Sequence, residues 1–401
     1  MTPLLPTTTA GPPDALPSPP RSVAIVLLSA VGDVVHGMPL PTSLKRAWPE
    51  CRVTWVIGRA ARELVAPHPD VDEFMVYGGG SGLEAAASLR DLRRRTRGRS
   101  FDLVLDPQVY LKAGLITALL DAPVKVGFDR ERSADLNGLF VDHRLPPREP
   151  GHVQDQYFEF LEWLGVDPVP EWRFAFTEGE RAARRRFYGR LDRPALAVAL
   201  RTTEAARDWR PGRWARVLEA AESELGLRPV IVGSDAPAER RVAEEVRSLT
   251  GARVVDAREN DLRRLAWLLD GAAVAVSPDT GPLHIADAVG TPVVGLYGCT
   301  DPERAGPYTS AYRELAVDRW SDPGERAGGE GGAGRRAAAA GGDADPRARR
   351  LPDRSSSDEK RPGRMGRITA DEVIEKLSLA VDRHVRDGVP ADGAPGGEAV
   401  G

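Results

Sequence analysis

The amino-acid sequence predicts an α/β protein built from two doubly wound domains. Short apolar runs rich in β-branched residues alternate with longer amphipathic stretches, which is typical of a parallel sheet covered by helices. This series occurs twice, and a polar, charged passage after Gly165 separates the two copies. The chain has 401 residues, enough for two domains with separate cores. Ligands are therefore expected in a cleft between the domains, at the carboxyl ends of the strands.

The first domain is predicted at residues 21–175. Its strands should be buried on both faces, because the runs are short and mostly apolar. They are expected at 23–28, 53–57, 74–77, 103–105 and 125–127. Helices are expected at 38–47, 83–94 and 152–164, the last of which should close the domain.

The second domain is predicted at residues 190–320 by the same alternation. Its strands are expected at 195–200, 229–232, 253–255, 274–277 and 292–296. Its helices are expected at 213–225, 238–249 and 262–269.

Three segments lack the large apolar residues that would offset the entropy of ordering, and we expect them to be disordered. Residues 1–20 are rich in Pro and Thr, and they have neither the basic start nor the apolar core of a secretory signal. Residues 321–365 contain mostly Gly, Ala, Arg, Asp, Pro and Ser, and the third segment is the tail at 388–401.

A C-terminal helix is predicted at residues 366–387. Thr369 and Glu372 form a capping-box pattern at its start, and apolar residues then recur at helical spacing. A single amphipathic helix must bury its apolar face, so this one should dock back onto the body.

Composition excludes several classes of protein. The net charge is −4, from 55 basic and 59 acidic residues, which argues against a nucleic-acid partner. Cys51 and Cys299 lie beside apolar runs, which favours a reducing cytoplasmic setting and excludes a structural zinc site. No apolar run approaches the roughly 18 residues of a membrane-spanning helix.

The first segment that could carry chemistry is SAVGDVVH, from Ser29 to His36, directly after the first strand. Gly32 allows a tight turn, and Asp33 would then face the cleft, where a carboxylate can accept a proton from a sugar hydroxyl. Alternatively, Asp33 only caps the following helix, which is the simpler explanation for this segment taken alone. This segment contains no G-x-G-x-x-G pattern, which argues against a classical dinucleotide site.

The second segment is RTTEAARDW, after the first strand of the second domain. The hydroxyls of Thr202 and Thr203, followed by the guanidinium of Arg207, suit the binding of a diphosphate. A polar surface loop explains the same residues equally well.

The third segment is a V-G-S-D turn followed by Glu239. An acidic residue in this position can accept hydrogen bonds from ribose hydroxyls. A solvated glutamate on a helix is the commoner explanation for any one such residue.

The fourth segment, SPDTGPLH, is the most informative. Asp279, Thr280 and Gly281 follow a buried strand, and a helix begins there and leads to His284. Free N–H groups and the positive end of the helix dipole would bind phosphate, and His284 lies about one turn further along. An ordinary N-cap with a buried histidine is the alternative, but the coincidence of all four residues favours an anion site.

These segments resemble glycosyltransferase family 9, the ADP-heptose–lipopolysaccharide heptosyltransferases. SAVGDVVH is similar to the family's S-x-x-G-D-V-I-H, and the stretch SPDTGPLHIADAVGTPVVGLYGCTDP is similar to its D-T-G-x-x-H-x-A-A segment and the G-x-T-D-P that follows. Residues 102–112 resemble a D-x-Q-G-x-x-K stretch, with Val109 at the Gly position. Several motifs in the right order make the resemblance specific to the family.

The resemblance implies a GT-B fold: two Rossmann-like domains, with a C-terminal helix packing back on the N-terminal domain. It also implies inverting, metal-independent transfer, in which Asp33 deprotonates the acceptor hydroxyl. No cofactor is implied. The donor would be a nucleotide sugar, ADP-heptose, and the acceptor a lipopolysaccharide core or related lipid-linked or oligosaccharide acceptor.

The site residues are carried over position by position. The implied donor-binding residues are Thr202, Thr203, Arg207, Glu239, Asp279, Thr280, Gly281 and His284. Lys112 and Arg132 match positions where basic residues face a negatively charged acceptor. Arg207 stands where the enzyme that adds the first heptose usually has Lys, and the insertion at 321–365 replaces a cysteine-containing stretch, so the acceptor stays open.

Two other functions remain open on the sequence. A nucleotide-sugar epimerase of the same architecture would need further acid–base residues in the cleft. The other alternative is a transferase that uses another nucleotide sugar. A silent nucleotide-binding module is disfavoured, because Asp33 lies in the other domain from the donor motifs.

A cytoplasmic protein is expected, and peripheral contact with the inner membrane surface is left open. Six arginines cluster between residues 90 and 99 and would suit anionic lipid. A solvated helix face and turn is the simpler interpretation. The clustered residues are Arg90, Arg93, Arg94, Arg95, Arg97 and Arg99.

Overall fold

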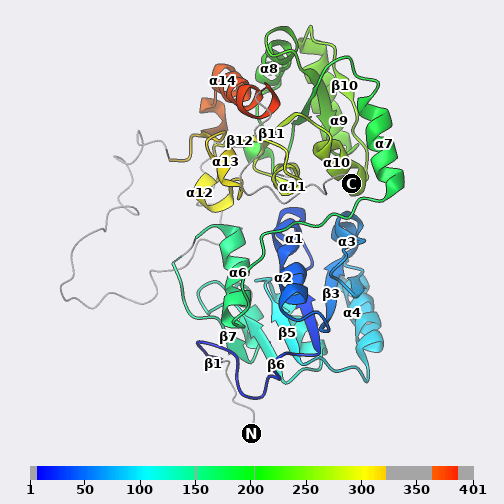
Figure 1. Ribbon diagram of the computed structural model, residues 1–401, viewed down its shortest axis with the longest axis vertical. Coiled ribbons are helices and arrows are strands. Elements are labelled where there is room, and N and C mark those ends of the chain that lie inside the picture. Colours follow the sequence, from blue (N-terminus) through cyan, green and yellow to red (C-terminus); the bar gives the residue numbers. More distant parts are fainter. Residues whose placement is uncertain (1–6, 150, 203, 322–363, 387–401) are drawn as a thin grey trace, which may run out of the picture.

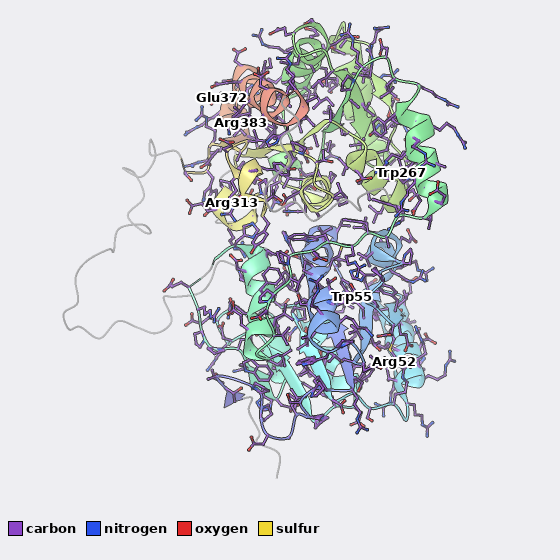
Figure 2. The ribbon with its side chains drawn as sticks, in the orientation of Figure 1. Arg52, Trp55, Trp267, Arg313, Glu372 and Arg383 are labelled. Carbon is purple, nitrogen blue, oxygen red and sulfur yellow. The ribbon has the colours of Figure 1, made fainter. Side chains whose placement is uncertain are left out.

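The computed structural model describes residues 7–149, 151–202, 204–321 and 364–386. It contains two α/β domains stacked along the long axis of the molecule (Figure 1), each built on a parallel sheet. Figure 2 labels a large aromatic side chain in each domain: Trp55 in the N-terminal domain and Trp267 in the C-terminal domain. Both are buried. The predicted α/β class with two doubly wound sheets is confirmed.

The N-terminal sheet has the order β1-β7-β6-β5-β2-β3-β4, and all neighbouring strands are parallel. Its strands are β1 (Thr7–Thr8), β2 (Ser22–Val26), β3 (Arg52–Gly58), β4 (Glu73–Tyr77), β5 (Leu103–Asp106), β6 (Val124–Gly127) and β7 (His143–Arg144). The central strands are apolar on both faces because helices cover both sides.

Alternate residues of β2 belong to different cores, as the period of a strand requires. Val23 and Ile25 pack with residues of the helices α1 (Val31–Gly37), α2 (Pro39–Ala47), α3 (Arg59–Val65) and α6 (Val153–Trp163). Ala24 and Val26 pack with residues of α4 (Gly82–Thr96) and α5 (Leu111–Leu119) on the other face.

The C-terminal sheet has the order β10-β9-β8-β11-β12-β13 and is also parallel throughout. Its strands are β8 (Ala195–Ala199), β9 (Arg228–Val232), β10 (Val255–Asp256), β11 (Val274–Pro278), β12 (Val293–Tyr297) and β13 (Val317–Asp318). Its helices include α7 (Glu178–Tyr188), α8 (Pro211–Ser223), α9 (Pro237–Leu249), α10 (Leu262–Asp270), α11 (Gly281–Ala288), α12 (Pro302–Ala305) and α13 (Ser310–Arg313).

The strand order of each sheet reverses at one point, between β2 and β5 in the first and between β8 and β11 in the second. Open parallel sheets bind ligands at such switch points, outside the carboxyl ends of the strands. The segments after these four strands contain most of the residues that the sequence analysis selected. Helices α1 and α11, which begin at these edges, meet where the two domains face each other (Figure 1).

The C-terminal helix α14 (Ala370–Ala380) packs on the C-terminal domain, and the expectation that it packs back on the N-terminal domain is wrong. Its apolar residues Val373 and Leu377 lie in one core with Trp214 of α8 and Tyr312 of α13. Ion pairs of Glu372 with Arg319, and of Arg383 with Glu314, bind the same end of the chain to that domain. Glu372 and Arg383, which are labelled in Figure 2, lie beside the C-terminal domain. The helix therefore buries its apolar face against the nearest complementary surface.

Residues 7–20, which the sequence predicts to be disordered, instead have a defined place. Thr7 and Thr8 pair with β7, the Trp163 indole Nε1 donates to the Thr9 carbonyl at 3.0 Å, and Pro20 is buried. An open sheet edge and a buried indole donor both need partners, and this segment supplies them. The predicted disordered stretches 321–365 and 388–401 lie outside the described residues, apart from Ser321, Arg364 and Met365.

Within the described ranges, no helix has both the length and the apolar character that crossing a bilayer requires.

Candidate active site

A charged cluster lies at the switch point of the C-terminal domain. Asp279 follows β11, His284 lies in α11, and Arg207 ends η2 (Ala205–Arg207), which follows β8. The Arg207 Nη1 atom is 3.3 Å from the Asp279 carbonyl oxygen and 3.4 Å from its Oδ2. His284 Nε2 is 3.4 Å from Asp279 Oδ1. The structure thus brings three of the sequence-selected residues together, with Arg207 and His284 on either side of the Asp279 carboxylate.

Asp279 acts as the anionic centre of this cluster. Burial alone would raise the pKa of its carboxyl group. The hydrogen bond and charge of His284, the charge of Arg207 and the hydroxyl of Thr300 together outweigh burial and hold that pKa below its usual value. The carboxylate is therefore ionised at neutral pH, and it orients two basic side chains at the carboxyl edge of the sheet.

The start of α11 offers fewer backbone donors than the sequence implies. Pro282 has no N–H group, and the Leu283 N–H donates to the Thr280 carbonyl at 2.9 Å. The close approach that requires Gly281 is made to the other domain, because a Cβ atom there would lie 3.2 Å from Cγ1 of Val31. Gly281 therefore serves the contact between the domains, and Arg207 and His284 are the side chains of this cluster that can bind an anion.

Asp33 lies in the first turn of α1, at the switch point of the N-terminal domain. Its Oδ2 atom accepts a hydrogen bond from the Ala30 N–H at 3.0 Å, so the capping role is present. A Cβ atom on the neighbouring Gly32 would lie 2.8 Å from Cδ2 of His284. The start of α1 is thus in contact with the charged cluster. A carboxylate has several acceptor positions, so capping is compatible with accepting a proton.

A histidine network joins the two domains beside this contact. The ring of His36 lies 4.7 Å from that of His284 and 5.9 Å from that of His152. His36 Nδ1 is 3.1 Å from the amide oxygen of Gln154, which can only accept, so Nδ1 carries the proton.

His152 connects α6 to the C-terminal domain. Its Nδ1 accepts from the Gln154 N–H at 3.0 Å, so Nε2 donates to the Gly306 carbonyl at 3.0 Å. Burial lowers the pKa of His152 to about 4, which keeps the ring neutral at pH 7. Sequence reasoning missed this role, since no local pattern places the two histidines together.

Gln108 is a second residue that sequence reasoning missed. Its Oε1 atom accepts from the Leu28 N–H at 2.8 Å, and its amide group donates to the Ser29 carbonyl. The side chain is buried and spans the switch point from the end of β5 to the loop that precedes Asp33. Gln108 is the Gln of the D-x-Q-G-x-x-K stretch, and this position could have identified it. Only Lys112 was selected from that stretch.

The remaining donor-site predictions fall on residues engaged in local turns. The Thr202 hydroxyl donates to the Glu204 carbonyl at 2.6 Å and accepts from the Glu204 N–H at 3.0 Å. Glu239 accepts from the Ser234 N–H at 2.9 Å and from the Ser234 hydroxyl at 2.7 Å, so it stabilises the turn after β9. Thr203 lies outside the described residues.

The two predicted acceptor residues differ. Lys112 is exposed in the first turn of α5, at the carboxyl edge of the N-terminal sheet. Arg132 is buried, with Nη1 2.8 Å from Oε1 of Glu159 and a second ion pair to Asp129. The expectation that Arg132 faces an acceptor is therefore wrong, because two carboxylates inside the protein hold its guanidinium.

In the part of the chain that the structure describes, no three His, Cys, Asp or Glu side chains are grouped to hold a metal ion. Cys51 and Cys299 are buried thiols.

Comparison with known proteins adds the family. The model of glycosyltransferase family 9 (heptosyltransferase) matches residues 89–328, more than half of the chain. The lipopolysaccharide core heptosyltransferase OpsX of Haemophilus influenzae is 28% identical over 312 residues, which cover 76% of this chain and 88% of that protein.

Two solved structures are similar in fold. The E. coli heptosyltransferase WaaC with ADP-2-deoxy-2-fluoro heptose matches with a TM-score of 0.57 and 25% identity, over 70% of this chain and 90% of that one. The glycosyl transferase family 9 protein of Veillonella parvula matches with a TM-score of 0.65 and 22% identity, over 74% and 85% of the two chains.

Proposed function

The chain belongs to glycosyltransferase family 9, and on that premise we propose that it transfers a heptose from ADP-heptose to a lipopolysaccharide core or related acceptor. Similarity to OpsX and to WaaC with an ADP-heptose analogue supports this choice of substrates. The acceptor would be lipid-linked or an oligosaccharide, and the enzyme would work at the cytoplasmic face of the inner membrane.

The observation that carries the proposal is the contact between the two switch points. Gly32, next to Asp33, lies against His284, so a proton acceptor from one domain adjoins a basic cluster from the other. A glycosyl transfer needs both: a base for the attacking hydroxyl and positive charge for the leaving diphosphate.

The mechanism follows from these positions. Asp33 takes the proton of the acceptor hydroxyl as its oxygen attacks the anomeric carbon from the face opposite the diphosphate, so the configuration inverts. Arg207 and His284 stabilise the negative charge that grows on the leaving ADP, while Asp279 keeps both side chains in place. Protein charge supplies this stabilisation, so we propose a reaction that needs no metal ion.

The test is Asp33→Asn, assayed with ADP-heptose and a lipopolysaccharide-core acceptor. Asn keeps a side-chain oxygen to accept from the Ala30 N–H, so the helix cap and the fold should survive. Loss of a general base should lower turnover by ~100-fold to 10,000-fold, while ADP affinity measured by calorimetry should not change. Near-normal turnover would show that Asp33 is only a cap, and consumption of donor without acceptor would indicate an epimerase.

A further inference from the structure

The loop between β6 and β7 contains a strained turn just before η1 (Asn137–Leu139). Asp135 and Leu136 have φ angles of 48° and 66°, in the left-handed region that residues with a Cβ atom avoid. Turns with positive φ at both central residues usually have glycine at the second, where this chain has leucine. The Leu136 side chain is 68% exposed, so its burial does not offset the strain. Strain of this kind persists where the surrounding structure holds it for a functional reason.

The two ends of the turn hold a second segment of the chain. The Asn137 N–H donates to the Ala134 carbonyl at 2.9 Å and closes the turn. The Asn137 side chain is buried, and its Nδ2 atom donates to the carbonyls of Gln108 at 2.8 Å and Tyr110 at 3.1 Å. The Ala134 N–H donates to the Val109 carbonyl between them at 2.9 Å. Three successive carbonyls after β5 are therefore bound by one turn.

Buried or partly buried arginines anchor the loop on both sides of the turn. Before it, Arg132 forms ion pairs with Asp129 and with Glu159, the latter at 2.8 Å. After it, Nη2 of Arg144 donates to the Gly138 carbonyl at 2.9 Å. These contacts do not depend on the turn, so they can keep its backbone strained and make it a fixed support. The buried ion pairs of Arg132 thereby gain a structural purpose.

A series of hydrogen bonds leads from this support to Asp33. Asn137 binds the backbone of Gln108, whose side chain accepts from the Leu28 N–H at 2.8 Å and donates to the Ser29 carbonyl. The N–H of the next residue donates to Asp33 Oδ2 at 3.0 Å. Each bond fixes the position of the group that makes the next one.

We propose that Asn137 is a positioning residue for Asp33, acting through Gln108, and that the strained turn serves to hold its amide in place. Asn137 lies in the N-terminal domain, whereas Arg207 and His284 belong to the other domain. Its loss should therefore lower turnover and leave ADP binding unchanged. The role in turnover rests on the proposed function, whereas the hold on the loop before Asp33 does not.

Three variants of the full chain separate positioning from plain stability. Asn137→Ala removes both side-chain hydrogen bonds. Leu136→Gly is the matched control at the adjacent residue, because it removes an exposed side chain and relieves the strain while Asn137 keeps its bonds. The third variant combines the two changes, so it should regain stability without regaining the amide.

Transfer from ADP-heptose to a lipopolysaccharide-core acceptor is the first measurement. In Asn137→Ala, kcat should fall about tenfold to a hundredfold, since small displacements of a reacting group have effects of this size. ADP affinity measured by calorimetry should not change. Leu136→Gly should keep the kcat of wild type and be at least as stable in urea.

The combined variant decides between the two roles. It should be more stable than Asn137→Ala and yet keep the low kcat. Recovery of kcat together with stability would show that Asn137 only stabilises the loop. A normal kcat in Asn137→Ala, or a matching loss of ADP affinity, would also overturn the proposal.

Amide hydrogen exchange gives a second measurement that does not require transfer. Residues 27–33 should exchange faster in Asn137→Ala and in the combined variant but not in Leu136→Gly, while residues 232–239 after β9 should not change. If wild type transfers no heptose but this pattern is found, the support stands and the proposed function fails. If wild type transfers heptose but exchange at 27–33 is the same in Asn137→Ala, the positioning proposal fails.

Discussion

The two switch points face each other but are held in different ways. In the N-terminal domain, the neutral amide of Gln108 secures the loop before Asp33 through backbone hydrogen bonds. In the C-terminal domain, ionised Asp279 holds Arg207 and His284. The neutral amide adds no charge beside Asp33, whereas Asp279 orients two basic side chains where an anion would bind. The difference indicates a proton acceptor on one side and an anion site on the other.

The largest effect after Asp33→Asn is expected from Arg207→Gln. It removes a charged partner of the diphosphate, worth ~1.5–3 kcal/mol, so ADP affinity should fall about 10-fold to 150-fold. Calorimetry should also show that added salt weakens ADP binding less in the variant than in wild type. If ADP affinity and its salt dependence were unchanged in the variant, the anion site would lie elsewhere than at Arg207.

Gln108→Ala tests the neutral support. The buried Leu28 N–H would lose its partner, at a cost of ~1–3 kcal/mol in the free energy of unfolding. Because the loop before Asp33 loosens, kcat should fall while ADP affinity stays constant.

Gln108→Glu sharpens the result. It keeps an oxygen for the Leu28 N–H but sets a buried carboxylate against the Ser29 carbonyl, so stability and kcat should fall at least as far as in Gln108→Ala. A loss of ADP affinity in either variant would show that Gln108 also serves the anion site, and would contradict its assignment to the proton acceptor alone.

His152 lies at the interface between the two domains, and its protonation should affect stability only at acidic pH. Its pKa of about 4 in the folded state lies below the ordinary value of 6.5, so the unfolded chain binds the proton more readily. The contribution of neutral His152 to the free energy of unfolding is present above pH 6.5 and is lost as the pH falls toward 4. Between pH 7 and pH 5 the loss should be about 2 kcal/mol.

Urea unfolding of wild type and His152→Gln at both pH values measures this contribution. The variant should be less stable than wild type at pH 7 but should lose less stability on going to pH 5. An identical pH dependence in the two proteins would show that His152 does not contribute to it.

Local patterns were enough to predict the longer strands of both sheets, the four strand-end segments and the cap of α14, but not the two-residue strands β1, β7 and β13. A buried parallel strand must be apolar on both faces, and Thr369 with Glu372 caps a helix whatever lies nearby. Parallel order then brings strand ends to one edge, so Asp279, His284 and Arg207 were selected before their distances were known.

Only the tertiary structure decided which surfaces meet. The apolar face of α14 is equally suited to either domain by its sequence, and the core around Trp214 determined its place. Arg132 has the same charge as Lys112, yet its carboxylate partners come from segments that only folding brings together. Gly281 fits a phosphate site in the sequence but lies against Val31 in the structure. A local pattern records the chemistry that a residue can perform, whereas its partner depends on contacts between segments far apart in the chain.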